Sequence, residues 1–173
     1  MACALIGGFV WDCIDSVGGI REIKVRAYPT NAVITSNFIV TSGIVAITTP
    51  GTTGWYTYFM EDETGGISDV TNVNRQQGTV FYQQEAKIVI NKLTAKLRNE
   101  LQVLAKNRLL IAVRDWNDNY WLVGRDSGAV MSTGSLVTGV ARGDRSGSEM
   151  TFVAKEVNPI NNMTSATYDA LVT

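Results

Sequence analysis

Carboxylates are the side chains of this sequence best suited to acid–base chemistry, and they occur together as Glu61-Asp62-Glu63 and as Asp12 with Asp15. A glycoside hydrolase needs two such groups facing one bond, but nothing in the surrounding residues fixes two of them in that geometry. The run at 61–63 precedes Gly65-Gly66, which favours a solvated turn. The chain contains no histidine, which removes the most common general base and zinc ligand.

Motifs typical of other enzyme classes are missing from the sequence. It has no G-x-S-x-G element, no phosphate-binding G-x-x-x-x-G-K-[ST] loop and no dinucleotide fingerprint after a strand. The only cysteines, Cys3 and Cys13, have a spacing that matches no metal-binding set. We expect them to be small buried side chains or to form one disulfide. The sequence therefore predicts no enzyme activity, no cofactor and no bound metal.

Aromatic residues form two groups that could bind a ligand by stacking. These groups are Trp55, Tyr56, Tyr58 and Phe59, and Trp116, Tyr120 and Trp121. Both groups lie on alternating segments beside turns, and few basic residues lie between them. Packing inside the fold or between subunits is therefore the preferred interpretation, ahead of a platform for sugars or bases.

The overall charge argues against a protein whose main task is to hold nucleic acid. Charged residues make up 18% of the chain, the net charge is -1 and the isoelectric point is about 5.4, whereas nucleic-acid-binding domains usually carry a basic patch. No signal peptide is recognisable, and no apolar stretch is long enough to cross a membrane. We expect synthesis in a cytoplasm without membrane insertion.

Most of the sequence predicts β-strands, because Thr, Val, Ile and aromatic residues alternate between closely spaced turn signals. The clearest pair is a hairpin formed by residues 67–77 and 79–91. In its second strand one set of alternate side chains is apolar and is predicted to face the core. That set consists of Val80, Tyr82, Ala86, Ile88 and Ile90.

One helix is expected at about 94–106, because leucines recur there at helical spacing and Thr94 can cap its start. A last strand is predicted at 148–156. The expected fold is mainly β: an antiparallel barrel or sandwich with one packed helix. A single domain would cover residues 1–157, followed by a peripheral or flexible tail at 158–173.

Several segments resemble virion structural proteins of tailed phages that infect Bacteroidetes-type bacteria, and within that group the tail tube (major tail) proteins. The similar segments are WDCIDSVGGIREIKV, QQGTVFYQQEAKIVINKLTAKLRNELQVLAKNRLLIAVRD, NYWLVG and GVARGDRSGSEMTFVAKE. Together they span most of residues 9–156. The similarity lies in the order of strands, helix and hairpins and contains no catalytic signature.

Tail tube proteins form hexameric rings that stack into a hollow tube, and each subunit gives long strands to a continuous barrel around the lumen. The resemblance implies that residues 67–91 form a lumen hairpin and that the helix packs behind it. It also implies that Gln83, Glu85 and Lys87 face the lumen. The implied partners are copies of the chain, a sheath or terminator protein and baseplate proteins, while DNA passes through without sequence-specific binding.

The resemblance also implies a location in the virion tail, after synthesis in the cytoplasm of the bacterial host. A second set of barrel strands is needed, and its candidates are residues 148–156 and 34–48.

Residues 139–147 contain the triplet Arg142-Gly143-Asp144, which matches a cell-adhesion motif. The fuller unit, GVARGDRSG, is a charged, glycine-rich turn before a strand, and nothing directs this chain to an animal cell surface. We expect Arg142, Asp144 and Arg145 to form salt links locally or between subunits. Two other functions stay open: another virion component, such as a head–tail connector or capsid decoration protein, and a carbohydrate- or receptor-binding β-domain.

Overall fold

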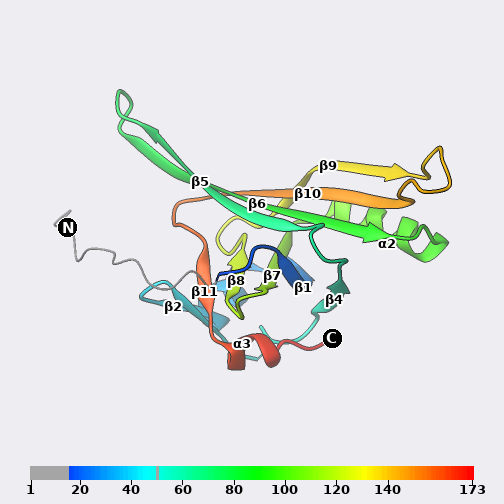
Figure 1. Cartoon of the computed structure of the whole chain (residues 1–173). Helices are drawn as coiled ribbons and strands as arrows, with labels where there is room; N and C mark the ends of the chain where they lie inside the picture. Colours follow the sequence, from blue (N-terminus) through cyan, green and yellow to red (C-terminus); the bar gives the residue numbers. More distant parts are fainter. Residues whose placement is uncertain (1–15, 50) are drawn as a thin grey trace.

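The computed structural model describes residues 16–49 and 51–173, and its strands form two sheets packed against each other (Figure 1). The larger sheet has the order β2 (Phe38–Thr41), β3 (Ile44–Ile47), β11 (Asn161–Met163), β8 (Tyr120–Val123), β7 (Leu109–Asp115), β1 (Ile20–Ala27) and β4 (Tyr56–Phe59). The smaller sheet has the order β5 (Gly66–Asn74), β6 (Thr79–Asn91), β10 (Gly147–Glu156) and β9 (Val130–Val137). The helices described are α1 (Asn31–Asn37), α2 (Ala95–Lys106) and α3 (Ser165–Asp169).

The chain is mainly β, as expected, but no barrel closes within it. All neighbouring strands are antiparallel except β3 and β11, which pair in parallel. The strands divide between two sheets, so each sheet keeps two edges without a partner strand among the described residues. The barrel is therefore wrong for a single copy, whereas two packed sheets agree with the sandwich alternative. The described residues contain three helices where one was expected.

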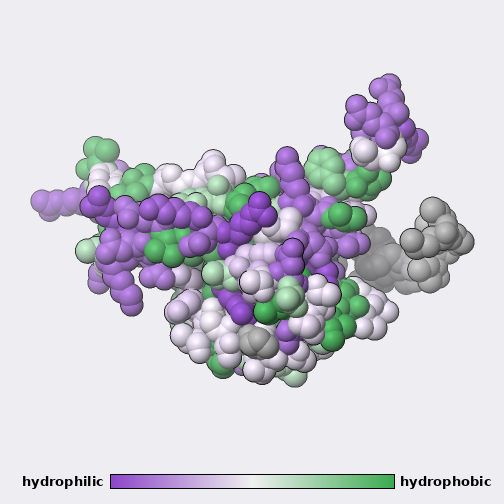
Figure 2. Space-filling view, turned by 180° about the vertical axis from the view of Figure 1, so that it is seen from behind, coloured by the Kyte–Doolittle hydropathy of each residue, from purple (hydrophilic) through white to green (hydrophobic). Residues whose placement is uncertain are grey.

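The β5–β6 hairpin extends beyond the two packed sheets as an arm (Figure 2). Its pairing runs from Gly66 opposite Lys87 to Asn74 opposite Thr79, so the turn lies at residues 75–78. The tip is hydrophilic, and a hydrophobic patch lies below it. The predicted hairpin is confirmed: β6 has the expected bounds, and β5 ends three residues earlier than expected.

The core between the sheets follows the period-two pattern of the strands. Ile23 and Val25 on β1 and Ile111 on β7 are buried against the smaller sheet. From that sheet, alternate residues of β6 and β10 point back toward them, namely Ala86, Ile88, Met150, Phe152 and Ala154. Burying each large apolar side chain stabilises the fold by about 1.5–3 kcal/mol.

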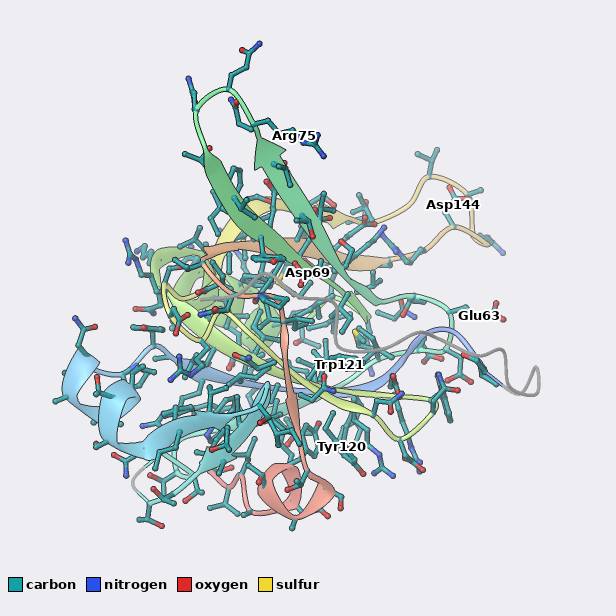
Figure 3. All side chains as sticks on the ribbon, turned by 90° about the vertical axis from the view of Figure 1, so that its left-hand side faces the viewer. Glu63, Asp69, Arg75, Tyr120, Trp121 and Asp144 are labelled. Atoms are coloured by element: carbon teal, nitrogen blue, oxygen red, sulfur yellow. The ribbon has the colours of Figure 1, made fainter. Side chains whose placement is uncertain are left out.

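A second core lies on the opposite face of the larger sheet. Leu110 and Ala112 of β7 are buried there against Trp55 and Tyr168. The consecutive residues Tyr120 and Trp121 of β8 separate to these two cores (Figure 3). Since β7 is covered on both faces, its LLIAV sequence is a continuous apolar run.

Helix α2 forms where the leucine spacing predicts it. The Thr94 hydroxyl accepts a hydrogen bond from the Leu97 amide at 3.1 Å, which is the expected N-cap. Leu104 is buried and Leu101 is partly buried in the core between the sheets. Helix α2 therefore covers the inner face of β9 and β10, next to the larger sheet.

Residues 158–173 differ from the predicted peripheral or flexible tail. They supply β11, which lies between β3 and β8 inside the larger sheet, and α3, whose Tyr168 is fully buried. The Trp55 amide also donates to the Val172 carbonyl at 3.0 Å. A three-residue strand gives too short a pattern to be recognised, and its partners lie far away in sequence.

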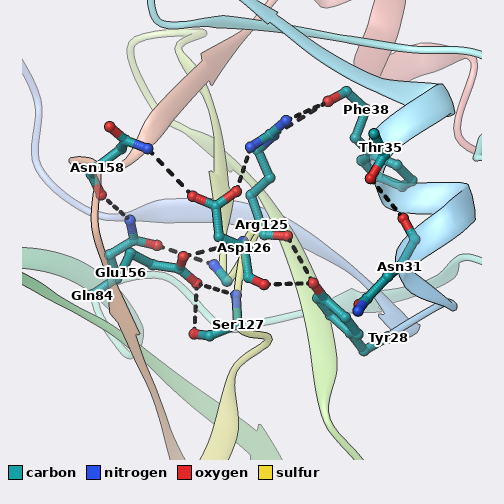
Figure 4. Close-up of polar contacts among 11 residues, drawn as sticks. Tyr28, Asn31, Thr35, Phe38, Gln84, Arg125, Asp126, Ser127, Glu156 and Asn158 are labelled. Atoms are coloured by element: carbon teal, nitrogen blue, oxygen red, sulfur yellow. Dashed lines mark hydrogen bonds and ion pairs between the residues drawn. The ribbon is translucent and has the colours of Figure 1, made fainter.

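A polar cluster ties the end of β10 to the larger sheet (Figure 4). The buried Glu156 carboxylate accepts bonds from the Asp126 and Ser127 amides at 3.1 and 3.0 Å and from the Ser127 hydroxyl at 2.9 Å. Buried Gln84 accepts from the Gly124 amide at 3.0 Å and donates to the Asn158 carbonyl at 3.3 Å. Burial raises the pKa of Glu156, although the bonds from Ser127 oppose this shift. The cluster fixes the β8–β9 connection against both sheets.

The buried C-terminal segment gives a stability prediction. Tyr168→Ala should lower the free energy of unfolding by about 3–5 kcal/mol, because it removes a buried ring from the second core. The matched variant Val172→Ala, at a half-exposed side chain nearby, should change it by less than about 0.5 kcal/mol. Urea unfolding measures both, and equally small effects would contradict the buried role of this segment.

Candidate assembly and channel-lining surfaces

One face of the smaller sheet packs on the core, and the described residues place no helix or strand over the other. The contrast is clear along β10, where Met150, Phe152 and Ala154 are buried while Thr151 and Val153 are half-buried. We call this second surface the open face. It contains alternate residues of all four strands.

The three residues predicted to line a lumen lie together on the open face. Gln83, Glu85 and Lys87 alternate along β6 with the core residues Ala86 and Ile88, so the predicted register is confirmed. On the neighbouring strand β10 they are paired in order with Lys155, Val153 and Thr151, which therefore lie on the same face of the sheet. That this face lines a channel stays a prediction.

Charges on the open face are balanced in sign. Lys87 forms an ion pair with Glu149 at 2.7 Å, and Arg145 reaches the same carboxylate at 3.0 Å. These contacts, that with Lys87 first, hold the pKa of Glu149 below its usual range. Lys155 lies 5.9 Å from the centre of the Phe81 ring. On the open face Lys87 is therefore paired with Glu149, while Lys155 and Glu85 form no ion pair among the described residues, and there is no basic stripe.

The sequence pattern predicts three of the four strands of this sheet, misses the fourth and offers one wrong candidate for it. Of the two candidate segments, residues 148–156 do belong to this sheet, where they form β10 beside β6. Residues 34–48 do not belong to this sheet, because they form part of α1 with β2 and β3 of the larger sheet. The fourth strand is β9, whose residues are exposed on both faces. Without a buried face, alternation gave no signal for it.

The two edges of the smaller sheet, β5 and β9, have no partner strand among the described residues. Natural edge strands are usually protected by lysine, proline or strong twisting. Neither strand contains lysine, arginine or proline, and β9 has no charged residue at all. One bulge interrupts its pairing with β10 near Ser132. These edges are suited to pairing with another strand.

The turn after β9, residues 138–146, carries the three residues predicted to contact other subunits. The Asp144 carboxylate accepts hydrogen bonds from the Val140 and Ala141 amides at 2.9 and 2.7 Å. Gly139 adopts a positive φ of 73° in this turn, which glycine allows without strain. Arg142 is exposed, while Arg145 pairs with Glu149. Asp144 and Arg145 thus make local contacts, and a role for the turn between subunits stays a prediction.

The aromatic groups do not converge on one platform. Trp55 is buried, with its indole N–H donating to the Gly51 carbonyl at 2.8 Å, and Trp121 packs on the core between the sheets. Trp116 is exposed and has the Arg21 guanidinium 5.6 Å from its ring centre. This distribution favours packing, which the sequence interpretation also preferred.

Residues Glu61, Asp62 and Glu63 form an exposed turn, as expected. Within residues 16–49 and 51–173, no group of three or more acidic or cysteine side chains could hold a metal ion. Cys3, Cys13 and Asp12 with Asp15 lie outside the described residues. No helix in the described part of the chain is long and apolar enough to cross a membrane.

The turn at Asp144 should respond to acid. The Ala141 and Val140 amides hold the pKa of Asp144 below its usual range. Their bonds are therefore fully present above the unfolded-state pKa of about 3.9 and are lost as the pH falls through the folded-state value. NMR of the unassembled subunit should show the Val140 and Ala141 amide shifts moving with a midpoint below about 3.9. Asp144→Ala should abolish this transition and, because bonds that lower a folded-state pKa stabilise the fold, should slightly lower the melting temperature at neutral pH while the subunit stays folded. A midpoint above the usual value would contradict the assignment.

In comparisons with models of known protein families, with curated proteins and with solved structures, nothing matches this chain significantly.

Proposed function

We propose that this chain is a tail tube subunit of a tailed phage, and that it assembles with copies of itself into stacked hexameric rings around a channel for DNA. The observation that carries the proposal is the smaller sheet, which combines one open face with two unpaired edges. The sequence resemblance to tail tube proteins points to the same kind of assembly.

The strand directions favour this mode of joining. The strands β5, β6, β10 and β9 alternate in direction because each neighbouring pair is antiparallel. With an even number of strands, the β9 edge of one copy runs opposite to the β5 edge of the next copy. Copies related by a rotation can therefore extend one antiparallel sheet around a ring and leave no edge.

The stagger of the strands favours a closed tube over a flat sheet. Strand β5 pairs with residues 79–87 of β6, whereas β9 lies, through β10, at the level of residues 85–91. A barrel requires such displacement because its strands tilt relative to the axis. With four strands from each of six copies, the barrel would be wide enough for an aqueous channel.

In that ring the open face becomes the channel wall, and the larger sheet and α2 lie outside it. Gln83, Glu85 and Lys87 then face the lumen. Since Lys87 is paired with Glu149, the wall offers DNA phosphates few free cations. DNA adheres to proteins mainly through such cations. A wall on which Lys87 is paired and only Lys155 is a cation without an ion pair on the described strands holds DNA weakly and lets it pass.

The assignment places the protein in the virion tail, with a sheath or terminator protein and baseplate proteins as partners. Negative-stain electron microscopy of the purified protein at high concentration should show six-fold rings or tubes with an open centre. A protein that stays monomeric under these conditions would argue against a tube subunit. Rings of another symmetry that do not stack would indicate a connector, and binding to capsids without stacking would indicate a decoration protein.

Proline substitutions test the role of the β9 edge. Neighbouring residues in an edge strand direct their N–H groups to opposite sides, so only one of Gly134→Pro and Ser135→Pro removes a bond to β10. The variant that keeps the wild-type melting temperature should lose ring formation in sedimentation velocity experiments. Full assembly of that folded variant would exclude β9 as a joining edge.

A further inference from the structure

An apolar groove of about 270 Å³ runs between α2 and the β9 edge, on the inner face of the smaller sheet. Its walls include Leu101 and Ala105 of α2, Met131 and Leu136 of β9, and Met150 of β10. It opens beside the unpaired edge of β9. At the β9 edge, the inner face of the smaller sheet therefore leaves apolar side chains of this groove exposed.

The projecting β5–β6 hairpin carries apolar side chains that no surface in the described part of the same copy covers. Val73 and Val80 are directly opposite each other near its tip, on the face that continues the core. Their side chains are 58% and 52% exposed, because the hairpin here extends beyond its own larger sheet. An apolar pair in this position gains stability only when another surface covers it.

We propose that the groove between α2 and β9 receives the Val73 and Val80 face of the hairpin from a second copy of this chain. The inference rests on the proposed ring, in which β5 of one copy pairs with β9 of the next. All inner faces then point outward from the channel, so Val73 and Val80 lie on the same side of the joined sheet as the neighbouring α2. If β5 starts level with the end of β9, Val73 comes close to Met131.

Charge complementarity identifies the occupant as a second copy. Antiparallel pairing brings the start of β5, preceded by the acidic turn Glu61-Asp62-Glu63, to the end of β9, which is followed by the exposed Arg142. In the same turn Arg145 is already paired with Glu149, and Asp144 accepts bonds from neighbouring amides, so Arg142 is the cation that can meet the acidic turn. Within the described residues, none of the three acidic side chains forms an ion pair. The acidic turn of one copy thus faces the basic turn of its neighbour, and the reverse strand direction would separate them.

Two valines on one hairpin provide a matched test of the groove. Val80→Asp places a carboxylate on the face that enters the groove, while Val70→Asp places it on the open face. The two side chains are 52% and 53% exposed, so neither change should alter the melting temperature of the subunit. Val80→Asp should raise the protein concentration needed for ring formation by at least about tenfold, because burying an unpaired charge is costly. Val70→Asp should assemble at nearly the wild-type concentration.

A charge exchange tests the paired turns. Arg142→Glu, and separately Glu61→Lys with Glu63→Lys, should each weaken ring formation, whereas combining all three changes should restore it. Asp169→Lys, a charge change of the same size at an exposed side chain of α3 on the far side of the larger sheet, is the control and should leave assembly unchanged. Salt should reduce the effect of either reversal.

These experiments separate the groove from the proposed function. Rings of the wild-type protein that form equally well with Val80→Asp and Val70→Asp would overturn the groove assignment and leave the tube intact. If the combined charge exchange fails to restore assembly, the acidic turn of one copy does not contact the turn with Arg142 of its neighbour. Absence of rings from the wild-type protein would overturn the tube and the groove together.

Discussion

The alternation of side chains along β6 and β10 is the constraint on which the other features depend. It gives the smaller sheet one apolar face, which packs on β1 and β7, and one face of mixed polarity, over which the described residues place no helix or strand. A shift of one residue in either strand would exchange these faces and place Lys87 in the core. The Gln84 and Glu156 contacts hold this register, because each side chain is buried and fully engaged with the β8–β9 connection or the segment after β10. The core between the sheets and the open face therefore both result from the alternation of side chains along β6 and β10.

The sequence predicts the elements whose signals are local. The alternation in 79–91 identified β6 and its two faces, and leucine spacing with Thr94 identified α2. It could not identify β9, because its side chains are exposed on both faces and include Gly134. It also could not place β11, since a strand of three residues owes its position to partners at 43–45 and 120–122. Of the candidate surfaces, the shared face of Gln83, Glu85 and Lys87 was predictable, but the groove was not, because it combines residues from α2, β9 and β10.

The two sheets differ in how completely the rest of the chain covers them. The larger sheet is covered on both faces of β7, whereas the smaller sheet is covered on one face only. The smaller sheet has unprotected edges and an apolar hairpin face whose burial requires a partner. In the proposed ring, the smaller sheet joins the copies and the larger sheet contributes most to the fold of each copy.

The position of β11 has a consequence for the timing of folding. The β2–β3 hairpin, formed by residues 38–47, joins the rest of the larger sheet only through Asn161–Met163. Contacts between residues so far apart form slowly, because a long loop must close before they are made. A chain still being translated therefore cannot complete this sheet until residue 163 has left the ribosome. The strands of the smaller sheet end at Glu156, so its two unpaired edges are synthesised before the larger sheet can be completed.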